Sequence, residues 1–394
     1  MDNLITLNSK ISINKPEGIV NKLYEAASIL RWNDHVKPVE LTEIDKQSHK
    51  MIIAFLLGKF EETYGNLKID WVKLIEGSIF EFLHRVVLTD IKPPVFHKMM
   101  KEKGPELNDW VINKLKEDLI EVSEVFFDKF KQYWFSSEYA KQEKRLLSAA
   151  HYLATSWEFK IVYPSSAFLY GIEKTKEDID NKMEDFSDLI GVEKIALHKK
   201  SYGFVDLCSQ LKFQQRWAQI PRIPKTSVLG HMYIVAVMSY IKTIQLSPCD
   251  KRIYNNFFAG LFHDLPEVLT RDIISPIKRS VEGLDKIIKD YENLQLEEKL
   301  LPLLPDLWHD EIRYFVNKEF ENKIIGNNER VKDLSIEDFS NKYNEDKFSP
   351  IDGKLIKLCD IYAAYKEVDI SIEMGLKSKQ LIEARNNIGK KLGF

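Results

Sequence analysis

Apolar residues recur at helical spacing along most of this chain. The pattern is clear over 17–32 and 49–64 and returns repeatedly afterwards. Apolar positions at i, i+3, i+4 and i+7 indicate helices that bury one face, whereas strands would show strict alternation between turn signals. Convincing alternating strands with hairpin turns are absent, and Gly and Pro stand mostly where helices would end. The sequence therefore predicts an all-α fold.

The chain also contains an internal repeat. Residues 79–95 align without gaps on residues 261–277 at an offset of 182, and the same offset places His49 on His231. Self-similarity at a fixed offset is the signature of a duplicated structural unit. With 394 residues the chain is long enough for two domains. We therefore expect a tandem duplication with helical domains at 1–172 and 196–394, joined by a charged linker at 173–195.

The repeat extends in both directions from this segment. Upstream, Arg31 and Trp32 correspond to Arg216 and Trp217 after a three-residue difference in length. Downstream, residues 145–154 resemble residues 354–363, which sets His151 opposite Asp360.

Candidate chemistry is concentrated in the second copy, in the otherwise apolar segment 261–278. His263 and Asp264 are adjacent, which suits two ligands on one metal ion, and Glu267 follows four residues after the histidine. Pro266 disfavours helix at the residue before it and can start a new helical segment, so the His-Asp pair should lie at a helix end. A buried His-Asp pair without a metal is the alternative.

Two further polar residues stand inside apolar runs and favour the metal. His231 opens one such run, and Asp360 lies within another. Together with His263 and Asp264 they supply two imidazoles and two carboxylates, a nitrogen and oxygen set for a divalent ion. Its identity among Co, Mn, Ni, Zn, Fe and Mg stays open.

The first copy lacks this pattern. Glu81, Phe82 and Arg85 stand where the second copy has His263, Asp264 and Glu267, so we expect the first copy to have lost the site. An alternative is a two-His, one-carboxylate site made by the following residues: His49, Glu81 and His151.

Composition excludes several other classes. The 57 basic and 60 acidic side chains show no basic bias, which argues against nucleic-acid binding. No apolar run approaches 18 residues and no basic start precedes an apolar core, so we expect a cytoplasmic protein without a membrane partner. The three cysteines lack CxxC spacing, which disfavours a thiolate site. The other histidines lack partners at ligand spacing and predict surface or capping roles: His35, His84, His97, His198 and His309.

The pattern of one His, a later His-Asp pair and a distal Asp resembles the HD-domain metal-dependent phosphohydrolases. Here these residues are His231, His263, Asp264 and Asp360. The run 263–272, with Arg216, Trp217 and 359–365, looks more closely like the bacterial 5′-deoxynucleotidase branch. The likeness covers most of 201–367 and is loose over 284–350. It departs before His231, where Leu229 and Gly230 replace the family's usual Ser-Glu pair.

The resemblance implies a role for each matching residue. Glu267 would orient or deprotonate the attacking water, Arg216 and Lys278 would bind phosphate, and Trp217 would pack on the sugar. Asp272 would hold a sugar hydroxyl or orient Arg216. Core or capping roles are the alternatives for Arg216, Trp217 and Asp272. The metal would be held by His231, His263, Asp264 and Asp360.

The implied activity is release of phosphate from nucleoside 5′-monophosphates, most of all 2′-deoxy ones. Two alternatives stay open. One is a phosphodiesterase or signalling-nucleotide hydrolase of the same superfamily, and the other is a nucleotide-binding or scaffold protein without turnover. Members of the branch often dimerise, so the chain is expected to form a homodimer or to use its first copy as a built-in partner.

Overall fold

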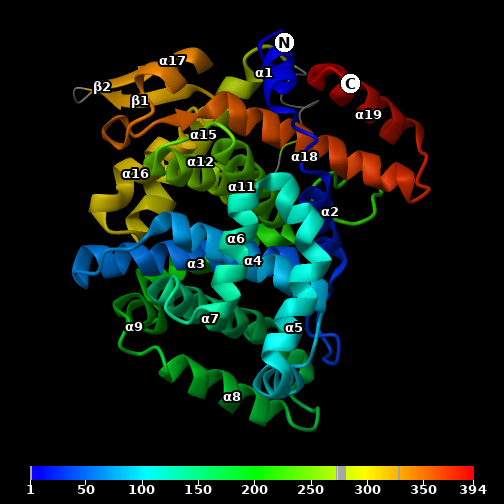
Figure 1. The fold of residues 1–394 in the computed structure, drawn as a ribbon, viewed down its shortest axis with the longest axis vertical. Helices are drawn as coiled ribbons and strands as arrows, with labels where there is room; N and C mark the ends of the chain where they lie inside the picture. Colours follow the sequence, from blue (N-terminus) through cyan, green and yellow to red (C-terminus); the bar gives the residue numbers. More distant parts are fainter. Residues whose placement is uncertain (1, 272, 274–280, 327–328, 333) are drawn as a thin grey trace. The chain divides into compact units, whose positions relative to one another are not determined.

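The computed structural model describes residues 2–271, 273, 281–326, 329–332 and 334–394 (Figure 1). Helices make up nearly all of its regular structure, and one small sheet is the exception, so the predicted all-α class is confirmed. Contacts divide the chain into two compact units. The N-terminal unit is residues 14–196, and the C-terminal unit is residues 1–13 together with 197–394.

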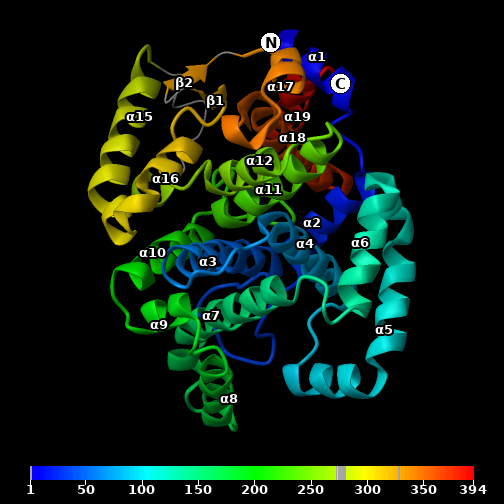
Figure 2. The ribbon, with the colours of Figure 1, turned by 60° about the vertical axis from the view of Figure 1, so that its left-hand side comes forward.

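The N-terminal unit is built around α3, whose residues are buried on almost every side. The helix begins where the Thr42 hydroxyl accepts a hydrogen bond from Asp45 N, which satisfies one free donor of the first turn. Helix α7 packs along it, and α5 runs beside α6 (Figure 2). The helices are α2 (Glu17–Ser28), α3 (Glu43–Tyr64), α4 (Trp71–Leu88), α5 (Pro93–Val122), α6 (Glu124–Phe135), α7 (Lys141–Ser166), α8 (Ile172–Glu184) and α9 (Ile190–Ala196).

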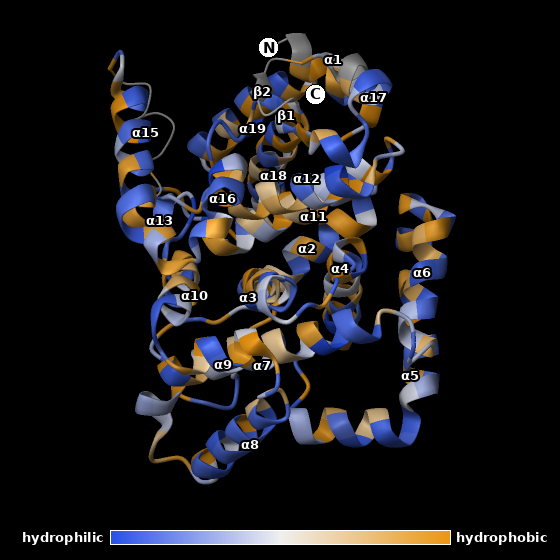
Figure 3. Ribbon diagram, turned by 90° about the vertical axis from the view of Figure 1, so that its left-hand side faces the viewer, coloured by the Kyte–Doolittle hydropathy of each residue, from blue (hydrophilic) through white to orange (hydrophobic). Residues whose placement is uncertain are grey.

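The segment expected as a linker, 173–195, is largely helical. It forms most of α8 and α9, and these helices pack on α7 and α3 respectively. Helix α8 is mostly hydrophilic (Figure 3), which is why its sequence resembles a linker, yet Ile172 and Ile179 form a small buried cluster with Phe159. Two apolar residues on one face are enough to dock a short charged helix.

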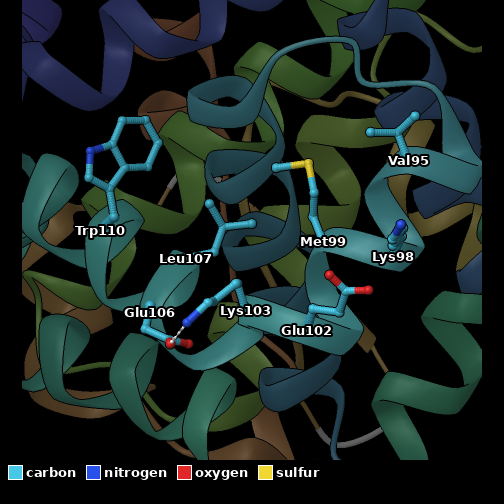
Figure 4. Close-up of a pocket in the computed structure, with 8 residues that line it drawn as sticks. All are labelled: Val95, Lys98, Met99, Glu102, Lys103, Glu106, Leu107 and Trp110. Carbon is cyan, nitrogen blue, oxygen red and sulfur yellow. Dashed lines mark hydrogen bonds and ion pairs between the residues drawn. The ribbon is translucent and has the colours of Figure 1, made fainter.

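Helix α5 bends and lines a surface hollow of about 530 Å³ (Figure 4). Pro105 lies inside the helix and Lys103, two residues earlier, leaves helical geometry. A proline ring removes one backbone hydrogen bond and clashes with the preceding turn, which accounts for the bend. The lining residues are Val95, Lys98, Met99, Glu102, Lys103, Glu106, Leu107 and Trp110.

The C-terminal unit is organised around α11, of which every residue but the last is buried. Helices α12 and α18 pack against it. The helices are α1 (Asp2–Ile11), α10 (Lys200–Gln210), α11 (Val228–Ile244), α12 (Asp250–Phe262), α13 (Glu267–Thr270), α15 (Leu284–Gln295), α16 (His309–Val316), α17 (Ile336–Lys342), α18 (Gly353–Glu373) and α19 (Lys379–Leu392).

Helix α1 belongs to this unit although its residues were expected in the first domain, 1–172. Asn8 Nδ2 donates to the backbone oxygen of Leu392 at 2.7 Å. The buried ammonium of Lys242 donates to the carbonyl oxygens of Ile11 and Ser12, at 3.1 and 2.7 Å. These bonds satisfy groups at the ends of α1 and α19 that the helices themselves leave open.

A three-stranded antiparallel sheet adds to the C-terminal unit. Strand β1 (Asn322–Gly326) lies between β2 (Glu329–Lys332) and β3 (Ile351–Asp352). The strands are too short for the alternation that signals a sheet in sequence. A buried ion pair between Arg252 and Asp352, at 2.7 Å, ties this sheet to α12. Among the described helices, none is long and apolar enough to cross a membrane.

His84 corrects one sequence prediction, because it is buried rather than a surface residue. Its Nε2 donates to Asn108 Oδ1 at 3.0 Å, and its ring stacks on Trp134 with centroids 3.9 Å apart. Burial lowers the pKa of His84 to about 4, since an imidazolium would lose its hydration there.

This histidine should make the unfolding free energy pH-dependent. Unfolded His has a pKa near 6.5, so the folded state binds fewer protons between about pH 6.5 and 4. The stability is fully present above pH 6.5 and is lost as pH falls towards 4. We expect the native chain to lose about 2–3 kcal/mol more than His84→Gln between pH 7.5 and 4.5, measured by urea unfolding. Parallel pH profiles for the two proteins would contradict this.

Candidate metal centre

His231 is fully buried in the first turn of α11. The helix is capped by Ser227, whose hydroxyl accepts a hydrogen bond from Gly230 N at 2.9 Å. This cap fixes the start of the helix and therefore the direction of the His231 side chain. His231 Nε2 lies 3.1 Å from Asp360 Oδ1 on α18. The predicted placement of both residues on buried helices thus brings them together.

His263 and Asp264 follow the last residue of α12, as predicted. Helix α13 begins at Glu267, directly after Pro266, so the chain opens between the two helices. His263 Nδ1 donates to Gly260 O at 2.7 Å, and this bond fixes the proton on Nδ1. His263 Nε2 is then the nitrogen that can bind a metal, and it lies 3.2 Å from Asp264 Oδ2.

The ligand atoms converge on one point. One atom each from His231, His263 and Asp264 lies within 4.8 Å of the others, and Asp360 contacts the first of them. Bonds of about 2.0–2.2 Å to one ion place its ligand atoms roughly 3 to 4.4 Å apart. The residues therefore fit a divalent metal with nitrogen and oxygen ligands. Glu267 is buried beside this group but is not part of it.

The charges of the metal-free site show how costly this cluster is to bury. Burial by itself would lower the pKa of His263, but the neighbouring Asp264 carboxylate outweighs it and raises the pKa to about 9. Burial would raise the pKa of Asp360, yet the Lys357 ammonium beside it holds that pKa well below its usual range. The two carboxylates of this cluster thus require positive charge beside them.

Arg216 and Trp217 are held by a residue that sequence reasoning missed. Trp217 Nε1 donates to Glu367 Oε2 at 2.8 Å, and Arg216 Nε lies 3.3 Å from Glu367 Oε1. Burial raises the pKa of Glu367, but Arg216 and its cationic neighbours lower it to about 2. Arg216 also reaches the metal centre, where its NH1 lies 3.8 Å from Asp264 Oδ2.

Two residues near the site were missed, Glu367 and Lys357, and they share one signal in the sequence. Each is a charged residue on an otherwise apolar helix, spaced so that it lies on the same face as Asp360. Glu367 follows it by seven residues and is 1% exposed. Lys357 precedes it by three. Asp272 and Lys278, both predicted to contact substrate, lie outside the described residues.

The N-terminal unit contains the same Arg-Trp-Glu arrangement. Trp32 Nε1 donates to Glu158 Oε2 at 3.0 Å, and Arg31 Nε donates to the same oxygen at 2.9 Å. The two tryptophans, Trp32 and Trp217, share a left-handed backbone with φ of 56° and 57°. The same hydrogen bonds therefore occur in a unit where the candidate ligand pair His263 and Asp264 is replaced by Glu81 and Phe82.

The helix caps indicate a different correspondence from the sequence alignment of His49 with His231. Thr42 caps α3 and Ser227 caps α11, and in each helix the fourth residue after the cap donates its N–H to the cap carbonyl. Counted from the caps, Lys46 stands where the C-terminal unit has His231. The offset of 182 residues applies only after the start of this helix. The three-residue difference in length between the units lies between the start of the helix and residue 79.

The alternative site made by His49, Glu81 and His151 does not form among the described residues. The Lys46 ammonium lies 2.8 and 3.0 Å from the ring nitrogens of His151, and Lys50 forms an ion pair with Glu81. His49 packs on Trp157 instead, with ring centroids 5.3 Å apart. An ammonium group thus contacts His151, the residue aligned with the ligand Asp360.

Comparison with known proteins points to the same half of the chain. Residues 208–389 match the HD domain family. This range includes the adjacent His263 and Asp264 and the two other candidate ligands.

Curated relatives are 5′-deoxynucleotidases. One from Vibrio atlanticus is 27% identical over 130 residues, 32% of this chain and 65% of the relative. One from Pasteurella multocida is 24% identical over 198 residues, 48% of this chain and 83% of the relative. One from Vibrio vulnificus is 28% identical over 131 residues, 30% and 61% respectively. The chain thus spans less than two thirds of the two Vibrio proteins.

The site should hold one divalent ion per chain. We expect Asp264→Asn to abolish metal binding, because it removes one anionic ligand, and His151→Gln to leave it unchanged. Metal content by mass spectrometry after dialysis is the measurement, with circular dichroism to confirm that both variants fold. Two ions in the native chain, or one ion retained in Asp264→Asn, would contradict the assignment.

Proposed function

We propose that this chain is a metal-dependent phosphohydrolase that releases phosphate from nucleoside 5′-monophosphates, with preference for 2′-deoxynucleotides. The observation that carries the proposal is the convergence of His231, His263 and Asp264 within 4.8 Å, with Asp360 against His231. Its support is that these residues lie in the range matching the HD domain, and that the curated relatives are 5′-deoxynucleotidases.

Phosphate monoesters resist hydrolysis because the phosphoryl oxygens repel an anionic nucleophile. A divalent ion, when bound, acidifies water and offsets charge on those oxygens. His231, His263, Asp264 and Asp360 would hold the ion. Glu267, buried next to the pair at the start of α13, would orient the attacking water and accept its proton.

The remaining roles concern the substrate. The NH1 of Arg216 lies 3.8 Å from Asp264, so its guanidinium is near enough to contact a phosphate at the same centre. Glu367 would keep that guanidinium in place. Trp217 would limit the space for a sugar 2′-hydroxyl, and Asp272 and Lys278 would contact sugar and phosphate as the sequence predicts.

We also propose that the N-terminal unit is a degenerate copy of the C-terminal one. Each unit pairs the residue before its Arg-Trp dipeptide with the capping residue of its central helix: Leu30 bridges Thr42, and Gln215 bridges Ser227. Lys46 and His151 stand at the positions of His231 and Asp360. In this copy a lysine side chain, in contact with His151, would occupy the place that the other copy gives to a candidate metal ligand.

Turnover tests the proposed function directly. Phosphate release should be seen with deoxynucleoside monophosphates in the presence of Co, Mn, Ni, Zn or Mg, and should stop on adding a chelator. Glu267→Gln should lower kcat about 10²- to 10⁴-fold with metal content unchanged, because only the proton acceptor is lost.

His309→Gln, at the start of α16, serves as the matched control and should keep full activity. Faster hydrolysis of cyclic or pyrophosphate nucleotides than of monophosphates would mean that nucleoside monophosphates are not the preferred substrates. Metal bound at one ion per chain without turnover of any nucleotide would exclude an enzyme of this type.

The proposal of a degenerate copy predicts that metal removal affects only the C-terminal unit. Removing the metal should expose buried amides in the helices that carry ligands, α11, α12 and α18, because uncompensated charge remains there. Peptides from α3 and α7 should keep their protection, since Lys46 is covalently part of the chain. Hydrogen exchange with and without chelator, read peptide by peptide, measures this. Equal loss of protection in both units would contradict the proposal that the N-terminal unit is a degenerate copy without a metal.

A further inference from the structure

Lys357 occupies a defined place at the edge of the metal centre. It lies on α18, one turn before Asp360, and its Nζ donates to Asp360 Oδ2 at 2.8 Å. The other oxygen of that carboxylate faces His231. The Lys357 side chain is 37% exposed, so part of it is open to solvent.

Phe320 fixes the ammonium from a second direction. Phe320 lies between α16 and β1, and Lys357 Nζ is 4.0 Å from the centroid of its ring. The same ring lies 6.1 Å from the imidazole of His263, centroid to centroid. One aromatic side chain thus borders both the ammonium and a metal ligand, which places Lys357 on the ligand side. Cation–π contact at this distance restrains a flexible lysine.

The ammonium retains hydrogen-bonding capacity in this position. It carries three N–H donors, and within the described part of the chain only the bond to Asp360 uses one of them. A group with donors to spare, held from two sides and partly exposed, is prepared to bind an acceptor.

The charge balance indicates which acceptor. A divalent ion would be neutralised by Asp264 and Asp360, and Arg216 is balanced by Glu367. Glu267 then adds one negative charge to this set, and Lys357 adds one positive charge. Lys357 offsets the charge of Glu267, and its ammonium offers a positive donor to an oxygen of a phosphate dianion.

We propose that Lys357 binds the phosphoryl group of the substrate and of the phosphate product, and that Phe320 positions its ammonium. This inference rests on the proposed phosphohydrolase function and identifies a phosphate contact within the described residues. Asp360 would keep one oxygen for the metal and one for Lys357, so the two cations sit on the same carboxylate.

The test measures inorganic phosphate binding to the metal-loaded protein by isothermal titration calorimetry, after a separate titration of Mn²⁺ alone. Lys357→Met should weaken phosphate binding about 10- to 100-fold, as expected for loss of a charge-assisted hydrogen bond. Lys357→Arg should restore most of it, and Phe320→Leu should weaken it several-fold. Lys379→Met, whose side chain is 88% exposed on α19, is the control and should change nothing.

The metal titration separates this role from a structural one. Mn²⁺ affinity should be unchanged or tighter in Lys357→Met, because a cation beside the ion has been removed. Weaker Mn²⁺ binding would mean that Lys357 serves only to hold Asp360, and unchanged phosphate affinity would also overturn the proposal. If phosphate binding depends on Lys357 but no nucleotide is hydrolysed, the phosphate contact stands and the proposed function fails.

Discussion

Compensation of buried charge is the constraint on which the rest of this structure depends. The C-terminal unit places two buried imidazoles and two partly buried carboxylates at the meeting of α11, α12 and α18. The N-terminal unit buries Glu43 and Glu158 more deeply, with 1% of each side chain exposed, and Arg31 forms an ion pair with both. Isolated ions in such surroundings would cost many kcal/mol. Each unit therefore needs positive charge at its centre, and the source of that charge decides whether chemistry is possible.

In each unit one buried carboxylate contacts both residues of the Arg-Trp dipeptide. The buried charge therefore also holds the dipeptide in position. Glu367 accepts the Trp217 indole N–H and lies within 3.9 Å of His231 Nδ1, so one buried acid is close to both the Arg-Trp dipeptide and a candidate metal ligand. Glu158 does the same work for Trp32 with no ligand to support. The shared part of the arrangement is structural, and what distinguishes the C-terminal unit is the short distance from Arg216 to Asp264.

Much of this could be predicted from the sequence, and the failures have physical causes. Period 3.6 hydrophobicity identified the helical fold, and the HD pair with Pro266 identified a helix end. The three-residue difference in length between the units misplaced His49, because periodic apolar positions align almost equally well one turn away. Glu367 and Lys357 were missed since a lone charge in an apolar helix is more often surface than site. The sheet was missed because β3 has two residues.

The contact between α1 and α19 has a consequence for the order of events during synthesis. Asn8 and Leu392, which it joins, are 384 positions apart, so the ribosome makes one partner long before the other. Residues 14–196 are contiguous and can fold as they emerge, whereas α1 can bury its apolar face only after α19 has been made. The C-terminal unit thus completes its packing later than the N-terminal one, and α1 stays accessible to chaperones in the meantime.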